Sequence, residues 1–73
     1  MLTYDEAVAN IDSAITVYQR RNKCNQADVA SKLAMTEVTL SYKRRGINEW
    51  KLNELIAVAM LTGVDAGLLV GGE

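Results

Sequence analysis

The 73-residue chain contains no histidine, no proline and no phenylalanine, and its one cysteine is Cys24. Without histidine it lacks the side chain that titrates near neutral pH, and one cysteine cannot complete a tetrahedral zinc site. Cys24 has no histidine to activate it as a nucleophile and no second cysteine for an internal disulfide, which suits a reducing cytoplasm. Phosphate-binding patterns such as GxxxxGK[ST] and GxGxxG are also missing. We therefore expect neither an enzyme nor a metal or cofactor site.

Long apolar runs are missing too. No stretch approaches the ~18 residues of a membrane span, and the first residues have neither the basic start nor the hydrophobic segment of a signal peptide. With 49% hydrophobic and 23% charged residues, the composition is that of a folded soluble protein. We expect a single small domain over residues 1–73, located in the cytoplasm.

The net charge of −1 hides an uneven distribution. All eight basic residues lie between Arg20 and Lys51, together with only three of the nine acidic residues, so the centre of the chain is basic and its ends are acidic. A basic segment of this kind is typical of nucleic-acid binding. Taken alone, it is explained better as a solvated basic surface.

Helical spacing dominates the apolar pattern. Thr3 and Glu6 match a capping box, and Arg20 and Arg21 suit the end of a helix, so we expect a helix over about 4–21. Its inward stripe is Val8, Ile11, Ile15 and Tyr18.

Two shorter helices follow. Asn25 is the cap of a helix that ends near Ala34, and Thr36 is the cap of one that runs to about Arg45, before Gly46. Two short helices separated by about three residues are a candidate helix-turn-helix.

The rest of the chain predicts two more helices. One covers about 50–62, with Asn48 or a nearby asparagine as its cap and Gly63 as its stop. The other is opened by Val64 and Asp65 and ends at about Val70. The residues expected to face inward from the first of these helices are Leu52, Leu55, Ile56 and Ala59.

Residues 26–46 resemble the helix-turn-helix of phage repressor and Cro-type regulators. The positions that fit the pattern of that family are Gln26, Val29, Ala30, Leu33, Met35, Thr36, Thr39, Leu40, Ser41 and Gly46. The resemblance extends over about residues 4–70. It implies an all-α, compact five-helix repressor-like domain of phage or mobile-element origin, which binds duplex DNA.

Two positions depart from the family pattern. Ala34 stands where the turn usually has glycine, and a left-handed alanine would cost on the order of 1 kcal/mol. Lys43 stands where the family has a large apolar residue. We expect its stem to lie over the core with the ammonium group at the surface, and Val38 or Trp50 to cover the gap.

The resemblance assigns the helix at about 36–45 to the major groove. Glu37 is placed to accept from a cytosine amino group, Val38 to touch a thymine methyl group, and Tyr42 to bond a base or phosphate. The DNA-binding residues that it implies are Gln26, Thr36, Glu37, Val38, Thr39, Tyr42, Lys43, Arg44, Arg45 and Asn48. Of these, Lys43, Arg44, Arg45 and Asn48 form the expected phosphate-binding set.

Each assignment has a structural alternative. Glu37 can serve as a charge at a helix N-terminus, Tyr42 as a half-buried packing residue, and Arg44 and Arg45 as a solvated face. The basic residues at 20–23 either approach the DNA flank or merely end the first helix.

The function that follows is sequence-specific duplex DNA binding by a transcriptional regulator. A single small domain buries little surface, so we expect a homodimer on a palindromic operator, and no contact with a membrane. The residues expected at the dimer surface are Met60, Leu61, Leu69 and Val70. The low pI and acidic ends suit an alternative, a helix-turn-helix module that binds a transcription or phage packaging protein.

Overall fold

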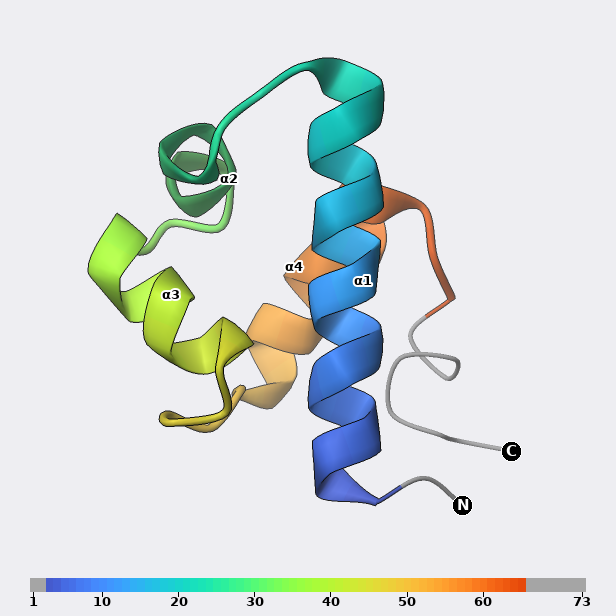
Figure 1. Ribbon diagram of the computed structural model, residues 1–73, viewed down its shortest axis with the longest axis vertical. Coiled ribbons are helices and arrows are strands. Elements are labelled where there is room, and N and C mark those ends of the chain that lie inside the picture. The colour runs from blue at the N-terminus through green and yellow to red at the C-terminus, as the bar shows by residue number, and fades with distance from the viewer. Residues whose placement is uncertain (1–2, 66–73) are drawn as a thin grey trace.

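The computed structural model describes residues 3–65, which form four helices joined by short loops (Figure 1). The helices are α1 (Tyr4–Asn22), α2 (Gln26–Lys32), α3 (Glu37–Arg44) and α4 (Leu52–Thr62). The all-helical class is as predicted, but the expectation of five helices is wrong: residues 3–65 contain four. In the segment expected to form the fifth, Val64 and Asp65 are not helical, and residues 66–70 lie outside the described part. None of the four helices is long and apolar enough to cross a membrane.

α1 is the longest helix and the one on which the others assemble. In Figure 1, α2 and α3 lie to one side of α1, and α4 passes behind it. α1 contacts each of the other three helices, and α2 also contacts α3. The buried core between them consists of Val8, Ile11, Ala14, Ile15, Val29, Ala30, Leu33, Leu40, Trp50 and Val58.

The ends of α1 are fixed by local hydrogen bonds. The Thr3 hydroxyl accepts from the Glu6 backbone N–H at 3.1 Å, and the Glu6 carboxylate accepts from the Thr3 backbone N–H at 3.0 Å. The bond from the Thr3 backbone N–H, together with one from the Thr3 side chain to the same carboxylate, lowers the pKa of Glu6, because hydrogen bonds to a carboxylate favour its ionised form. At the other end Lys23 is left-handed, with φ of 51°. The predicted first helix is confirmed at both ends.

The predicted helix pair is also confirmed. Asn25 and Asp28 form a second reciprocal capping box at the start of α2, and the Thr36 hydroxyl accepts from the Thr39 backbone N–H at the start of α3. Between the two helices Ala34 has φ of 58°, in the left-handed region that favours glycine. The turn therefore carries backbone strain that a glycine would not.

α4 differs from the expectation in two ways. Its N-cap is Lys51 and not Asn48, since the Lys51 backbone N–H donates to Glu54 at 2.8 Å. Its inward face is also rotated, because Val58 is fully buried while Leu52 and Ile56 are exposed. Residues 55–61 are apolar almost throughout, so the sequence carries little amphipathic signal to choose a face. Glu54, one turn before the buried Val58, is on the inward side too, where it pairs with Lys43.

We predict that Ala34→Gly stabilises the protein by up to about 1 kcal/mol, because it relieves a left-handed alanine. Ala9 supplies a matched control, as it is exposed in the middle of α1. The same change there should destabilise the protein by about 1 kcal/mol. Urea denaturation of the two variants and the parent measures both effects, and a loss of stability in Ala34→Gly would contradict the strain argument.

Candidate nucleic-acid interface

The outward side of α3 carries an exposed stripe of three residues. Val38, Tyr42 and Arg45 follow one another at intervals of four and three residues, and all three are exposed, while Leu40 on the opposite side is fully buried. The Arg45 guanidinium lies over the Tyr42 ring, 5.5 Å from its centroid. This contact restrains a long side chain that would otherwise be free to rotate. The stripe thus offers an apolar group, a phenol and an oriented cation on one face.

The first turn of α3 adds one charge to this face. Glu37 is exposed there, next to the N-cap. Thr36 and Thr39 use their hydroxyl groups within the cap, since the Thr36 hydroxyl also bonds the Thr39 hydroxyl at 2.8 Å. Both threonines therefore lie where the sequence predicted, but with their hydroxyl groups engaged by each other.

Lys43 lies inside the protein, so its predicted ammonium at the surface is wrong. Its side chain is 7% exposed, and its Nζ lies 2.8 Å from a Glu54 carboxylate oxygen. The same Nζ donates to the Glu49 carbonyl at 2.8 Å and lies 5.9 Å from the centre of the Trp50 ring. Trp50 in turn donates its indole N–H to the Lys43 carbonyl at 3.1 Å. Of the two residues expected to cover the gap, Trp50 is buried against Lys43 and Val38 is exposed.

The Lys43–Glu54 pair changes the titration of its acidic member. Burial raises the pKa of Glu54, but hydrogen bonds from the Lys43 ammonium and the Lys51 backbone N–H outweigh it, together with both lysine charges. The pKa of Glu54 is therefore lowered in the folded protein. A carboxyl group with a lowered pKa stabilises the fold above its unfolded pKa, and this contribution is lost as the pH falls.

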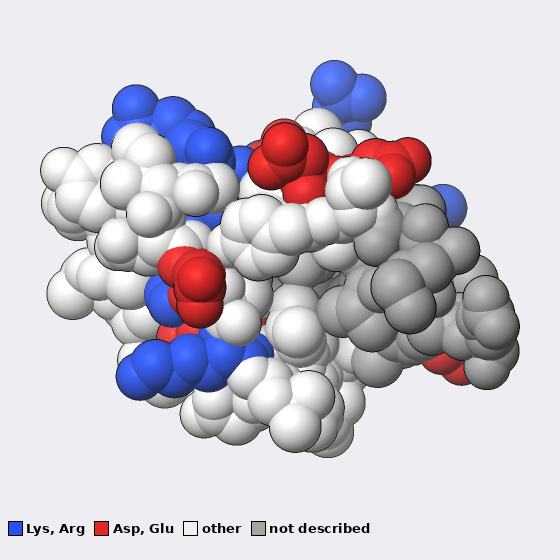
Figure 2. Space-filling view, turned by 90° about the horizontal axis from the view of Figure 1, so that it is seen from below, with Lys and Arg blue, Asp and Glu red and all other residues white. Residues whose placement is uncertain are grey.

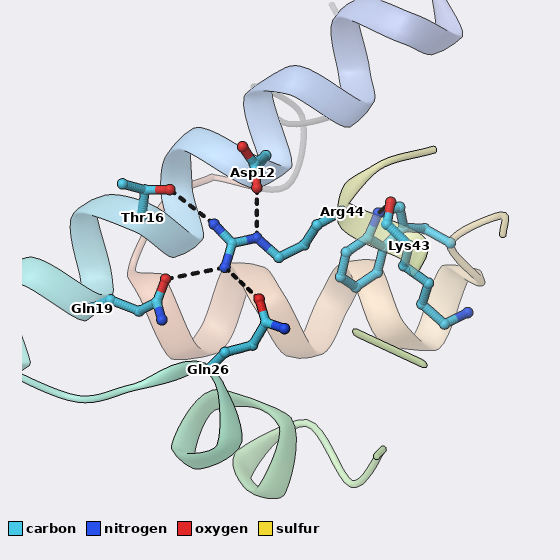
Figure 3. A network of polar contacts seen from close by, with 7 residues as sticks. Asp12, Thr16, Gln19, Gln26, Lys43 and Arg44 are labelled. Atoms are coloured by element: carbon cyan, nitrogen blue, oxygen red, sulfur yellow. Dashed lines mark hydrogen bonds and ion pairs between the residues drawn. The ribbon is translucent and has the colours of Figure 1, made fainter. Parts of the chain in front are cut away.

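Arg44 is a link between three helices rather than a surface cation (Figure 3). From the last turn of α3, its Nε lies 2.5 Å from an Asp12 carboxylate oxygen. Its terminal nitrogens donate to Thr16 at 2.9 Å and to Gln19 at 3.1 Å, both on α1, and to Gln26 on α2 at 3.1 Å. We call these five side chains the Arg44 network. Because four acceptors occupy the guanidinium, Arg44 is not free to bind phosphate in this arrangement.

The Arg44 network also orients Gln26, which is the first residue of α2. Its Oε1 accepts from Arg44, so its amide nitrogen points away from the guanidinium, as Figure 3 shows. The Gln26 amide N–H groups are thereby held as donors at the start of α2. Asn48 lies exposed in the loop after α3, where its backbone N–H donates to the Tyr42 carbonyl at 3.4 Å.

The sequence analysis missed the three α1 residues of the Arg44 network. Asp12, Thr16 and Gln19 recur at intervals of four and three residues, which places them along one side of α1. These three polar residues lie beside the apolar stripe of α1 that faces the core. Their position indicates that a polar side chain from another helix could pack against them. Their partner Arg44 is 25 to 32 residues away from them in the chain, so spacing alone does not identify it.

The structure divides the predicted site into two groups. On or near the outward side of α3 lie Glu37, Val38, Tyr42 and Arg45, while Lys43 and Arg44 turn inward. On the face shown in Figure 2, Lys and Arg groups form separate patches with Asp and Glu groups between them. Of the predicted phosphate-binding cations only Arg45 is exposed. The positive charge at this site is smaller than the sequence suggested.

The other side of α1 faces a hollow. Tyr18, Arg21, Leu61 and Val64 are among the residues that line this space of about 650 Å³ between α1 and the end of α4. At 100° per residue, Arg21 points away from the side of α1 that carries the Arg44 network. Within residues 3–65, no cluster of acidic residues and Cys24 is arranged to hold a metal ion.

We predict that Glu54→Gln costs about 1–3 kcal/mol at neutral pH, because Lys43 keeps its burial but loses its counter-charge. The loss should shrink as the pH falls below the ordinary pKa of a glutamate, because the contribution of the ionised Glu54 is then progressively lost from the parent as well. Glu37→Gln is the control, since that exposed carboxylate should contribute only a few tenths of a kcal/mol. Thermal denaturation between pH 3 and 7 measures both, and a loss that does not depend on pH would contradict the assignment.

We predict that Arg44→Lys destabilises the protein by about 1–2 kcal/mol, because an ammonium group cannot reproduce the planar guanidinium contacts with both α1 and α2. In a domain of this size each kcal/mol corresponds to about 4–8 °C in melting temperature. The same substitution at the neighbouring Arg45, which is exposed, should stay within about 0.5 kcal/mol. Equal melting temperatures for the two variants would show that the network contributes nothing.

No family model, no curated protein and no solved structure matches this chain. The resemblance to phage repressor and Cro-type regulators therefore rests on residues 26–46 and their surroundings, and the function that it implies is a proposal.

Proposed function

We propose that this protein binds duplex DNA sequence-specifically and regulates transcription, with α3 in the major groove. The observation that supports the proposal is the exposed stripe of Val38, Tyr42 and Arg45 on the second helix of a rigidly held pair. In a helix-turn-helix the second helix lies in the major groove while the first crosses the backbone. The protein acts without catalysis or cofactor, in the cytoplasm of a bacterial or phage-infected cell where the DNA is.

The side chains of α3 have chemistry suited to base edges. Val38 offers an apolar contact for a thymine methyl group, and Glu37 an acceptor for the cytosine amino group. Tyr42 supplies one hydroxyl group for a base or a phosphate. A base preference would arise from these three residues, because each matches a different pattern of groups in the major groove.

Phosphate contacts are assigned to the residues that remain available around this face. Arg45 supplies the charge, and Asn48 and Gln26 supply neutral N–H donors. Gln26 is the best oriented of them, since Arg44 holds its oxygen and leaves its nitrogen pointing away from the guanidinium. Neutral donors fix the position of the protein on DNA without adding to its salt dependence.

Two copies on a palindromic operator complete the proposal, because one module of this size buries too little surface for high affinity. Of the residues expected at a dimer surface, Met60 is exposed, Leu61 is half-buried, and Leu69 and Val70 lie outside the described residues. Of the expected dimer surface, the described part therefore lies on α4 alone.

A protein-interaction module is the second candidate. It is favoured by the inward turn of Lys43 and Arg44, which leaves a net charge of −1 with fewer cations near α3 than DNA binding usually employs. The two candidates differ in their response to salt. The affinity for DNA falls steeply as the salt concentration rises. The affinity of a contact with a protein through Val38 and Tyr42 would depend little on salt.

We predict that the parent protein binds a pool of random duplexes in a salt-sensitive manner, measured by fluorescence polarisation at two or more salt concentrations. Arg45→Gln should weaken binding to all sequences and make the slope of log K against log salt shallower by about 1. Arg21→Gln removes the same charge on the far side of α1 and should leave the slope unchanged. If the parent shows no salt-sensitive binding, the DNA proposal fails and the interaction module stands.

A further inference from the structure

The outward face of α4 is apolar along its length. Leu52, Ile56 and Met60 are 73%, 47% and 80% exposed. They follow one another at intervals of four residues, so they form a single line about 12 Å long. We call them the α4 stripe. Large side chains exposed together in this way are typical of a surface that another molecule covers.

No charge interrupts the α4 stripe. The one charged residue within α4 is Glu54, and its side chain is 16% exposed and paired with Lys43. Elsewhere in the described chain, exposed Tyr4 lies beside Asp5 and exposed Val38 lies beside Glu37. A partner for the α4 stripe therefore needs an uncharged apolar helix face, and α4 itself is such a face.

We propose that the α4 stripe is covered by α4 of a second copy of this chain, in an antiparallel arrangement around a twofold axis. When the twofold axis passes through Ile56, this residue lies against the partner's Ile56. The same axis places Leu52 opposite the partner's Met60, since both lie four residues from the axis. The stripe is thus complementary to itself in length and in side-chain size.

The ends of α4 support the antiparallel direction. Lys51 is exposed at the N-terminal end, and the last turn of α4 contains no basic residue. An antiparallel pair brings Lys51 near the C-terminal end of the partner helix, where the helix dipole is negative. A parallel pair would instead place the two Lys51 charges side by side.

The size of the α4 stripe sets the strength of this contact. Stable complexes bury about 800 Å² on each partner, which is more than one 12 Å line of side chains provides. The contact is therefore weak between free molecules and strengthens when two copies are held close together. Only this last consequence rests on the proposed DNA function; the contact itself does not.

Disulfide trapping tests the contact in the absence of DNA. In a Cys24→Ser background, Ile56→Cys places a thiol on the proposed axis, where two copies can meet at the Cα separation of about 4.4–6.8 Å that a disulfide needs. Val17→Cys is the matched control, because Val17 is 44% exposed on α1 and Ile56 is 47% exposed. Met60→Cys is a second control, more exposed but off the axis. Circular dichroism checks that each variant is folded.

We expect Ile56→Cys to form dimers on mild oxidation about tenfold faster than either control, because the contact raises the local thiol concentration. Adding an excess of the Cys24→Ser protein, which has no thiol, should slow the formation of the Ile56→Cys dimer.

Equal rates of dimer formation for Ile56→Cys and Val17→Cys would overturn the proposal. So would rates that follow exposure, with Met60→Cys the fastest. So would an Ile56→Cys thiol that resists maleimide, since another segment of the same chain would then cover the stripe. Failure here leaves the salt-dependent DNA binding of the parent unaffected, so the two proposals fail separately.

Discussion

The Arg44 guanidinium is the group on which the geometry of α3 depends. It leaves the end of α3 and bonds Asp12, Thr16 and Gln19 on α1 and Gln26 on α2, so that one planar group fixes three helices relative to one another. α2 has only seven residues and α3 only eight, lengths at which an isolated helix is marginal in water. Their orientation must therefore come from tertiary contacts. Burial of Val29 and Leu40 holds α2 and α3 against the core. The guanidinium group fixes the orientation of the two helices, because its donors lie in one plane.

Lys43 and Arg44, which are neighbours in sequence, anchor α3 on two sides. Arg44 reaches toward α1 and α2. Lys43 reaches toward the start of α4, where its ammonium group pairs with Glu54 and lies 5.9 Å from the centre of the Trp50 ring. A small domain buries few apolar groups, so polar anchors of this kind decide which packing is adopted. Lys43 and Arg44 are two of the eight basic residues in the central basic segment of the sequence. Their inward turn leaves the outward side of α3 with a mixed apolar, aromatic and charged character, suited to base edges more than to a long row of phosphates.

The local features of the fold were predictable because each depends on residues three or four positions apart. The Thr3–Glu6 capping box and the caps at Asn25 and Thr36 follow directly from capping chemistry, whereas the strain at Ala34 was expected from the resemblance of residues 26–46. The directions of Lys43 and Arg44 were not predictable in this way, since their partners lie far along the chain and a long cationic side chain is ordinarily at the surface. The inward face of α4 was missed for a related reason: its apolar residues surround the helix, and the partner of Glu54 on the inward side, Lys43, belongs to α3. Of the site itself, the exposed positions of Glu37, Val38, Tyr42 and Arg45 agree with the pattern of residues 26–46.

The linkage of α2 and α3 through Arg44 has a mechanical consequence. The angle between α2 and α3 cannot change to follow the curvature of different duplexes, because the same Arg44 guanidinium joins both helices to α1. A change of angle would break its bonds to α1 as well. On the proposed duplex, the DNA would have to supply the adjustment by bending or changing its groove width. The energy of that deformation depends on the stiffness of the base steps between the two contacted sites. Base pairs that the protein never touches would then contribute to its selectivity.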